Sequence, residues 1–191
     1  MAVESQPTEL GTPAHAFDLP IANPWIDGEA STTRSLRQYD EAEVLVVVFT
    51  CNHCPYAVHV ERALVALAKT YTPNEAQFVA ISSNDATTHP EDRFDKMAER
   101  AREIGMPFPY LHDETQLTAR AYGAVCTPDF FVYDKNRKLA YRGRFDETRP
   151  NMGTAHGGEL RKVIEALLAT GRYDGPQHPA MGCSIKWKRA D

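Results

Sequence analysis

The run Val44–Phe49 consists only of apolar residues, without alternation between apolar and polar positions. Such a run is typical of a strand that is buried on both faces of a sheet. The sequence Cys51-Asn-His-Cys54 follows it, and a helical pattern begins near Pro55. Two cysteines three positions apart therefore lie at a strand-to-helix junction. One is at the helix N-terminus, where the helix dipole and free N–H groups favour a thiolate, and the second is one turn deeper, near enough to form a disulfide.

The rest of the chain has apolar patterns that predict an α/β fold. The helix after Cys54 carries an apolar stripe at spacings of three and four residues, and Pro55 falls in its first turn, where a missing N–H costs little. The further elements that we expect are a strand at Phe78–Ser82, a helix opened by Pro90 and ended by Gly105, a short helix at Thr115–Tyr122, strands at Asp129–Tyr133 and Lys138–Arg144, and a helix over Leu160–Leu168. The strand–helix–strand unit predicts parallel pairing, and the polar turn at 134–137 predicts an antiparallel hairpin. Together they predict a mixed central sheet flanked by helices.

The two ends of the chain have weaker patterns. We expect a flexible N-terminal arm at residues 1–16, a main domain at 17–171 and a C-terminal tail at 172–191 that is rich in Pro and Gly. The domain begins with short apolar pieces and the turn signal Asp27-Gly28, which predict an N-terminal β-hairpin extension packed on the main sheet. The tail carries Cys183.

Composition limits the function classes. The chain has 191 residues, enough for one domain with its own core, and its net charge of −5 with dispersed basic residues argues against a nucleic-acid surface. The N-terminus has no apolar segment of a secretory signal, and no segment approaches the ~18 apolar residues that span a bilayer. We therefore expect a cytoplasmic protein with no nucleic-acid or membrane partner. In a reducing compartment its four cysteines indicate redox or metal chemistry rather than a disulfide framework.

Three segments resemble the thioredoxin superfamily. They are Val46-Val-Val-Phe-Thr-Cys51-Asn-His-Cys54-Pro, Gly123-Ala-Val-Cys126-Thr127-Pro128-Asp-Phe-Phe-Val-Tyr and Arg142-Gly-Arg144. Within the superfamily the chain is most similar to the redoxin branch, which comprises peroxiredoxin-like proteins and thiol–disulfide oxidoreductases with an N-terminal hairpin. The tail sequence Met181–Trp187 resembles that of CxxC-containing redoxin-domain proteins of bacteria. The resemblance covers residues 11–170 and implies a thioredoxin-like fold.

The resemblance also implies roles for four residues. Cys51 corresponds to an exposed nucleophilic cysteine and Cys54 to a buried resolving cysteine. Pro128, preceded by Thr127, corresponds to a cis-proline that faces the motif and holds the backbone of the partner. Only ~5% of X–Pro bonds in folded proteins are cis, so this assignment rests on the resemblance. Thiol–disulfide exchange needs an attacking thiolate, a second thiol and a dock for the substrate, and these residues can supply all three.

Two departures from the superfamily bear on the mechanism. Thioredoxins have a buried carboxylate on the strand before the motif, which helps to deprotonate the resolving thiol, whereas this chain has Val48 near that position. Proton transfer is then left to His53, Asp129 or water. The peroxiredoxin pattern Pro-x-x-x-Thr-x-x-Cys is also absent, whether it is counted back from Cys51 or from Cys54.

His53 lies between the two cysteines, directly before the resolving one. An imidazole there would stabilise the Cys51 thiolate, lower its pKa and favour the reduced form, which makes the couple more oxidising. The alternative is an exposed histidine with little influence. A zinc site would need two further ligands, and Cys126 and Cys183 do not form a second CxxC pair. We therefore expect no metal and no cofactor.

Cys126 lies two residues before Pro128, and thus near the predicted site. It is an additional resolving thiol, a peroxide-sensing or pocket-lining residue, or simply a small buried apolar residue. Cys183 could fold back to pair with it, although sequence alone cannot fix the connectivity. Arg144, together with Arg142, is an auxiliary candidate because a cation beside the thiolate would assist peroxide or disulfide chemistry. The alternative is a pair of solvated strand arginines.

These observations predict a thiol–disulfide oxidoreductase that uses the Cys51–Cys54 couple to reduce or exchange disulfides. Its substrates would be disulfide-containing proteins or small molecules, and its electrons would come from a thioredoxin- or glutathione-type reductant. One alternative is a thiol-dependent, antioxidant peroxidase of the peroxiredoxin-like kind, which consumes hydroperoxides. A further alternative is a redox-inactive thioredoxin-like binding module, whose activity would survive replacement of both cysteines.

Overall fold

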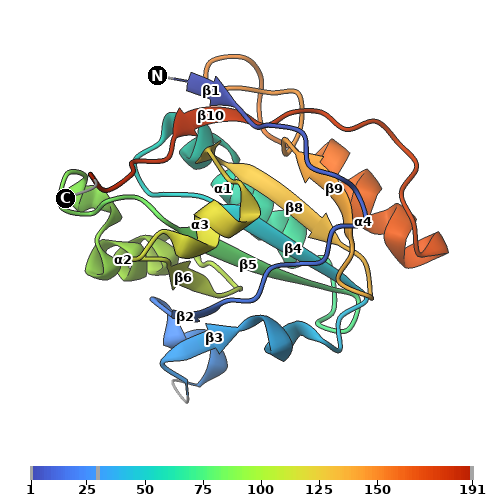
Figure 1. Cartoon of the computed structure of the whole chain (residues 1–191), viewed down its shortest axis with the longest axis horizontal. Helices are drawn as coiled ribbons and strands as arrows, with labels where there is room; N and C mark the ends of the chain where they lie inside the picture. The colour runs from blue at the N-terminus through green and yellow to red at the C-terminus, as the bar shows by residue number, and fades with distance from the viewer. Residues whose placement is uncertain (1, 29–30, 190–191) are drawn as a thin grey trace.

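The computed structural model describes residues 2–28 and 31–189, and its centre is a five-stranded sheet (Figure 1). The strands lie side by side in the order β6–β5–β4–β8–β9. The first three of these, β4 (Val44–Phe49), β5 (Ala76–Ser82) and β6 (Tyr110–His112), pair in parallel. The other two, β8 (Asp129–Tyr133) and β9 (Leu139–Gly143), are added antiparallel. The predicted mixed sheet is therefore confirmed.

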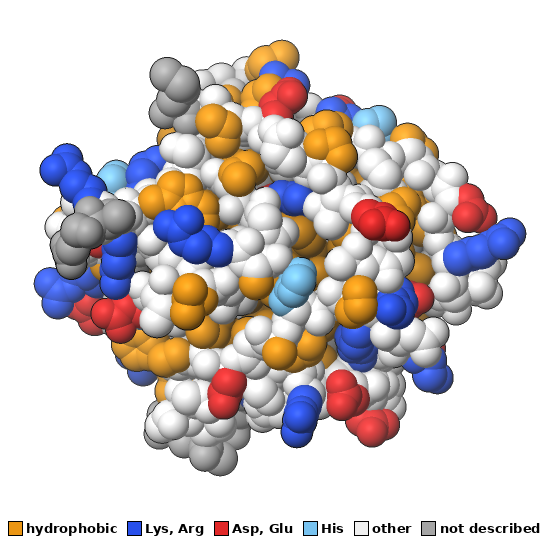
Figure 2. All heavy atoms as spheres, viewed as in Figure 1, with side chains coloured by type: hydrophobic (Ala, Val, Ile, Leu, Met, Phe, Trp, Pro, Cys, Tyr) orange, Lys and Arg blue, Asp and Glu red, His pale blue; other side chains and the backbone are white. Residues whose placement is uncertain are grey.

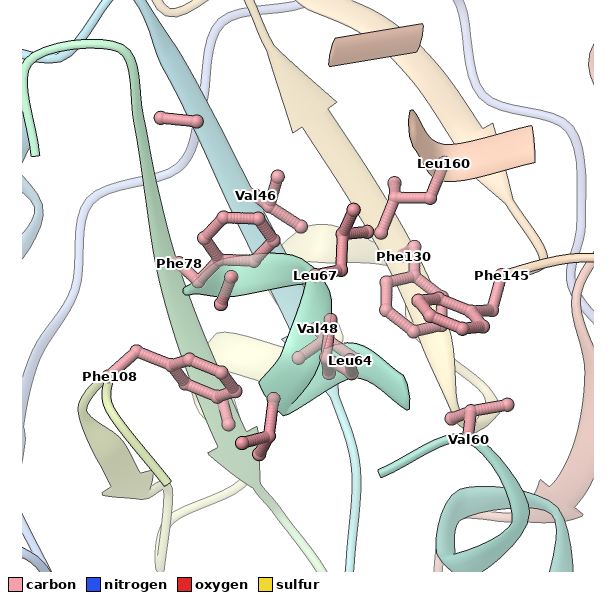
Figure 3. Close-up of a cluster of buried hydrophobic side chains, with 14 of the residues drawn as sticks. Val46, Val48, Val60, Leu64, Leu67, Phe78, Phe108, Phe130, Phe145 and Leu160 are labelled. Atoms are coloured by element: carbon pink, nitrogen blue, oxygen red, sulfur yellow. The ribbon is translucent and has the colours of Figure 1, made fainter. Parts of the chain in front are cut away.

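Strand β4 is buried on both faces, as its unbroken apolar run predicts. Its six residues have no exposed surface, and alternate side chains enter two different cores. On one face Val46 and Val48 pack with residues of α1 (Pro55–Ala68), α2 (Phe94–Ile104) and α4 (Gly158–Thr170), as Figure 3 shows for several of them. On the other face the strand packs against α3 (Leu117–Tyr122) and the N-terminal hairpin.

Two predicted helices begin later than the sequence indicates. Pro90 opens a separate 3₁₀ turn, Pro90–Asp92, and Arg93 then has an extended backbone (φ −62°, ψ 153°), so that α2 begins only at Phe94. The side-chain oxygen of Asp92 accepts a hydrogen bond at 2.8 Å from the backbone N–H of Asn52, so the last residue of this turn is bonded to the cysteine motif. Helix α3 likewise begins after Gln116, whose φ of 63° lies in the left-handed region.

The predicted N-terminal hairpin is present. Strands β2 (Asp18–Pro20) and β3 (Thr33–Ser35) pair antiparallel, and Phe17 beside them is buried in the core next to α3. The connection contains a 3₁₀ helix at Pro24–Asp27 that ends at Gly28, where φ is 70°. The hairpin thus covers part of one sheet face, although its turn is longer than a two-residue loop.

The two ends of the chain meet in a second sheet. Strands β1 (Ala2–Glu4), β10 (Met181–Ser184) and β7 (Cys126–Thr127) pair antiparallel in the order β1–β10–β7. Figure 1 shows β1 and β10 alongside each other, in blue and red. Strand β1 belongs to the segment for which the sequence predicts a flexible arm, and its partner lies at the opposite end of the chain, where no local pattern can indicate it. The limits of the main domain at residues 17 and 171 stay a prediction.

The surface carries charges of both signs. Figure 2 shows acidic and basic side chains interspersed over one face, with apolar side chains in small groups. Large apolar side chains that are exposed come from separate parts of the chain, among them Leu10, Leu117 and Met152. Within residues 2–28 and 31–189, none of the helices combines the length and the apolar character needed to cross a bilayer.

Truncation of a side chain between α4 and the sheet should destabilise the fold. Leu160 has no exposed surface, so we expect Leu160→Ala to lower the free energy of unfolding by about 2–5 kcal/mol. Leu117→Ala is the matched control, because Leu117 is 66% exposed, and it should change stability by about 0.5 kcal/mol or less. Denaturant titration measures both values. Equal losses in the two variants would contradict this description of the core.

Candidate active site

The cysteine motif lies at the carboxyl end of β4, where the chain enters α1. Cys54 is the N-cap residue of α1, with an extended backbone (φ −71°, ψ 121°), and Pro55 takes the first helical position, where its fixed φ suits the helix. Cys54 is 0% exposed and Cys51 only 4% exposed. The resemblance implies that Cys51 is exposed, and the structure corrects this expectation. The reason is that two other segments pack on the motif, one carrying Asp92 and the other Cys183.

Strand β7 brings Thr127 and Pro128 against the two sulfurs. The peptide bond between them is cis, as the resemblance implies. The Thr127 hydroxyl oxygen is 3.4 Å from Cys51 Sγ, and the Thr127 carbonyl oxygen is 3.1 Å from Cys54 Sγ, to which it offers a hydrogen-bond acceptor when Cys54 is protonated. All four cysteines are free thiols. The fold thus joins the four residues of the predicted site from two segments that are far apart in the sequence.

The imidazole of His53 bonds to a buried carboxylate that the sequence did not reveal. His53 Nδ1 is 2.6 Å from Oδ2 of Asp92, which has no exposed surface. Asp92 also accepts hydrogen bonds at 2.8 Å from the backbone N–H of Asn52 and from the side-chain amide of Asn84. The sequence predicts that His53 acts on the Cys51 thiolate. In the structure, Nδ1 of His53 instead forms a hydrogen bond with Asp92. No signal near Asp92 could have identified it, since its partners lie in other segments.

Three potential metal ligands meet at this point. One ligand atom each from Cys51, His53 and Asp92 lies within 4.8 Å of the others. The carboxylate of Asp92 is already an acceptor for Asn52, Asn84 and His53, so its oxygens are committed to hydrogen bonds that join the motif to the 3₁₀ turn Pro90–Asp92. The three residues lie close together because the hydrogen bonds of Asp92 hold the motif in place.

The two motif cysteines differ in their affinity for a proton. A hydrogen bond from the Cys51 thiol lowers the pKa of Cys54 to about 4 against the effect of burial, and hydrogen bonds from Cys183, the Ala57 N–H and Thr127 act in the same direction. The same hydrogen bond to Cys54, together with burial and the charge of Asp92, raises the pKa of Cys51. The surroundings of Cys54 therefore favour its thiolate form, whereas those of Cys51 favour its thiol form.

The other two cysteines have different surroundings. Cys126 has no exposed surface, and burial raises its pKa. Its sulfur lies 4.0 Å from the carbonyl oxygen of Ala180. In the register of β10 and β7, Cys183 lies opposite Thr127 and Ser184 lies opposite Cys126. The thiols of Cys183 and Cys126 are both free. The pairing of Cys183 with Cys126, which the sequence left open, is not formed in this structure. Cys183 instead packs beside the two motif cysteines.

A model of the AhpC/TSA family matches residues 10–142, well over half of the chain. The chain belongs to the AhpC/TSA family. This is a redoxin family of thiol–disulfide oxidoreductases and peroxiredoxin-like proteins, which agrees with a site built on two sulfurs.

Solved structures of similar proteins support this assignment. An uncharacterized conserved protein from Geobacillus kaustophilus is 44% identical with a TM-score of 0.92, over 100% of this chain and 98% of that one. A hypothetical protein from Sinorhizobium meliloti 1021 is 39% identical with a TM-score of 0.91, over 98% and 99%. A putative thiol:disulfide interchange protein DsbE from Chlorobium tepidum is 20% identical with a TM-score of 0.63, over 85% and 99%, and shows the thioredoxin-like fold. None of the curated proteins compared with the chain matches it.

In this AhpC/TSA protein a small cavity adjoins Cys51. Its volume is about 20 Å³, and its lining includes Asn52, Glu61, Arg100 and Tyr110. Arg100 forms an ion pair with Glu61, and the hydroxyl of Tyr110 donates to the side-chain oxygen of Asn52 at 3.1 Å. A cavity of this size holds about one water molecule, so it can admit a small polar molecule to Cys51 but not a segment of peptide.

The two arginines that the sequence singled out are held by carboxylates. Arg144 lies 2.5 Å from Glu159 of α4. This ion pair competes with the auxiliary role beside the thiolate that the sequence predicts for Arg144. Arg142 is buried and lies 2.8 Å from Asp129, which directly follows Pro128. Burial raises the pKa of Asp129 to about 6, against the opposing charge of Arg142. Both guanidinium groups thus take part in structural ion pairs of this AhpC/TSA chain.

The lowered pKa of Cys54 predicts the pH dependence of the reduced protein. Ultraviolet thiolate absorbance should persist as the pH falls and disappear only near pH 4. Cys54→Ser should abolish this transition, and Cys51→Ala should move it to higher pH because the largest stabilising hydrogen bond is lost. Since the folded-state pKa lies below that of a free cysteine, this thiolate stabilises the fold at high pH, and its contribution is lost as the pH falls toward 4.

Cys126→Ala is the control for this titration. Burial keeps the Cys126 thiol protonated, so the variant should leave the low-pH transition in place. A reduced protein whose thiolate absorbance appears only above pH 8 would contradict the charge distribution described here.

Proposed function

We propose that the chain is a thiol–disulfide oxidoreductase whose redox couple is formed by Cys51 and Cys54. The observation that carries the proposal is the placement of both sulfurs against Thr127, beside the cis peptide bond to Pro128. Membership of the AhpC/TSA family supports it, because redoxins act through thiols. The reduced pair holds one proton and one negative charge, which is the state from which thiol–disulfide exchange begins.

The exchange proceeds in two balanced steps. Cys51 attacks one sulfur of a substrate disulfide, so that the bond between the substrate sulfurs breaks, a mixed disulfide forms and the departing substrate thiolate takes the Cys51 proton. The Cys54 thiolate then attacks the Cys51 sulfur and releases the second substrate thiolate. The sequence left proton transfer to His53, Asp129 or water. In the proposed step the departing substrate thiolate takes this role.

The surroundings of the couple determine which partners fit. Cys51 is nearly enclosed, and the adjoining cavity is small, which favours small-molecule disulfides over protein segments as substrates. We place the reaction in the cytoplasm, where a thioredoxin- or glutathione-type system would return electrons to the couple. Donors around Cys54 stabilise the reduced form, so the couple should be more oxidising than one without them.

Reduction of a small disulfide tests the proposal directly. The reduced protein should release both thiols of oxidised glutathione or a chromogenic aryl disulfide while its Cys51 and Cys54 thiols are lost in equal amounts. Cys54→Ser should stop the reaction after release of the first thiol, because the motif then has no thiol that can attack the mixed disulfide on Cys51. Cys126→Ala, which removes a buried thiol outside the couple, should retain the rate. Wild-type protein that is inert toward several disulfides and reductants would refute the proposal.

A second candidate function is peroxidase activity at Cys51. The observation that favours it is the small cavity beside Cys51, together with the Thr127 hydroxyl 3.4 Å from its sulfur. Attack of Cys51 on a hydroperoxide would give a sulfenic acid and an alcohol, and Cys54 would then form the disulfide and release water. The absence of the Pro-x-x-x-Thr-x-x-Cys pattern counts against rapid turnover.

Loss of hydroperoxide and trapping of the sulfenic acid would distinguish the two functions. In Cys54→Ser the intermediate on Cys51 should persist and react with dimedone, because the resolving thiol is missing. Disulfide exchange without hydroperoxide consumption would leave the oxidoreductase as the single function. Rapid hydroperoxide consumption with no activity toward disulfides would instead make peroxidase activity the favoured function.

A further inference from the structure

The C-terminal strand β10 lies directly on the candidate active site. Its two edges are both paired, with β1 on one side and β7 on the other, and Cys183 faces Thr127 in the register. The resemblance implies that the Thr127–Pro128 segment docks the backbone of a substrate. Here β10, a segment of the same chain, pairs with Thr127, so that edge is already occupied.

Gly182 makes this close approach possible. A Cβ atom at this position would lie 1.9 Å from the Thr127 carbonyl oxygen and 2.5 Å from its carbonyl carbon. Backbone atoms cannot yield as the end of a flexible side chain can, so any side chain here would force β10 away from β7. The tail can therefore pack against the Thr127–Pro128 peptide group because residue 182 has no side chain.

Contacts beyond β10 hold the tail in place. The side chain of Ile185 is buried in the core beside α3, and its N–H donates to Val125 at 2.9 Å. The carbonyl oxygen of Lys186 accepts a hydrogen bond at 2.8 Å from each of two partners, the N–H of Asp85 and the side chain of Gln116. The tail is thus a fixed part of the site, and the position of Cys183 follows from it.

Cys183 places a third sulfur next to Cys54. It packs against the cluster formed by Cys51, Cys54 and Ala57, and its thiol helps to lower the pKa of Cys54. Cys183 is also the partly exposed thiol of the three, whereas Cys51 and Cys54 are 4% and 0% exposed. Cys54 is therefore in contact with one thiol beside the internal cavity and another that is accessible from the surface.

We propose that Cys183 is a third redox thiol, which attacks Cys54 in the Cys51–Cys54 disulfide and transfers that disulfide to the protein surface. This rests on the proposed function, which forms the first disulfide. The Cys183 sulfur bonds to Cys54, the Cys51–Cys54 bond breaks, and the proton of Cys183 passes to Cys51. The step is an isomerisation, so it needs no oxidant or reductant. An external thiol reductant then attacks at Cys183, while Cys51 is already reduced beside the cavity.

The charge on Cys54 determines when this step takes place. Burial and the hydrogen bond to Cys54, together with the Cys54 charge, raise the pKa of Cys183 to about 11, so it stays protonated while the site is reduced. Once Cys54 is part of a disulfide, its charge and its acceptor role are gone, and deprotonation of Cys183 becomes easier. The exchange is thereby coupled to oxidation of the motif.

Mapping of disulfides after oxidation tests the proposal without a physiological partner. Full-length protein is oxidised with diamide, alkylated and digested without reductant, and the linked peptides are quantified by mass spectrometry. In wild type we expect both Cys51–Cys54 and Cys54–Cys183 linkages, with Cys126 free. In Cys51→Ser, oxidation should lower the free thiols from three to one through a Cys54–Cys183 disulfide, since four cysteines less Cys51 leaves three.

A second variant separates the position of the tail from the presence of its thiol. Gly182→Ala keeps all four cysteines but displaces β10, so it should lose most of the Cys54–Cys183 linkage and retain Cys51–Cys54. Ser184→Ala, two positions along the same strand, is the control and should behave as wild type. Circular dichroism of each variant establishes that the fold persists.

The outcomes discriminate between the two proposals. Formation of Cys51–Cys54 in wild type, with Cys183 fully alkylated both in wild type and in Cys51→Ser, would overturn the third-thiol role and leave the proposed function intact. Failure of wild type to form a disulfide at Cys51 under any oxidant would remove the proposed function itself. A Cys126–Cys183 linkage as the main product would also contradict the proposal.

Discussion

Strand β4 has no side chain in contact with solvent, and this burial underlies the architecture of the active site. A strand buried on both faces needs a covering layer on each side, which α1, α2 and α4 supply on one face and α3 with the hairpin on the other. The cysteine motif begins within two residues of the end of this strand. The sulfurs are thus placed by the most completely packed element of the protein, and a rigid support of this kind keeps reactive groups in a defined geometry.

Charge at the site is distributed by hydrogen bonds rather than by a nearby cation. Asp92 is buried, yet it accepts from three donors, one of them His53, and this compensates for its loss of hydration. Its negative charge disfavours a thiolate on Cys51, whereas donors converge on Cys54 at the N-terminus of α1. The candidate site therefore combines a nearly enclosed Cys51, which adjoins a small cavity, with a buried Cys54 whose thiolate form is favoured.

The second sheet changes how this thioredoxin-like fold can be used. Pairing of β10 with β7 covers the Thr127 edge, and Gly182 allows the two backbones to approach closely. The active site of this AhpC/TSA chain is therefore more enclosed than a pair of cysteines at a helix end would indicate. Cys54 has a sulfur neighbour on each side, from the motif and from the tail.

The central sheet, the four predicted helices and the nearness of Cys51 to Cys54 could be predicted from the sequence, because they follow from apolar periodicity and from a spacing of three positions. Thr127 and Pro128 were also foreseen, through their resemblance to a known motif. Only the tertiary structure decided that His53 bonds to Asp92, that Arg144 bonds to Glu159, and that Cys183 rather than Cys126 joins the two motif sulfurs. Each of these contacts joins segments that are distant in the sequence, and such contacts depend on how the strands pair and which loops cover them. Local patterns of polarity do not indicate that pairing.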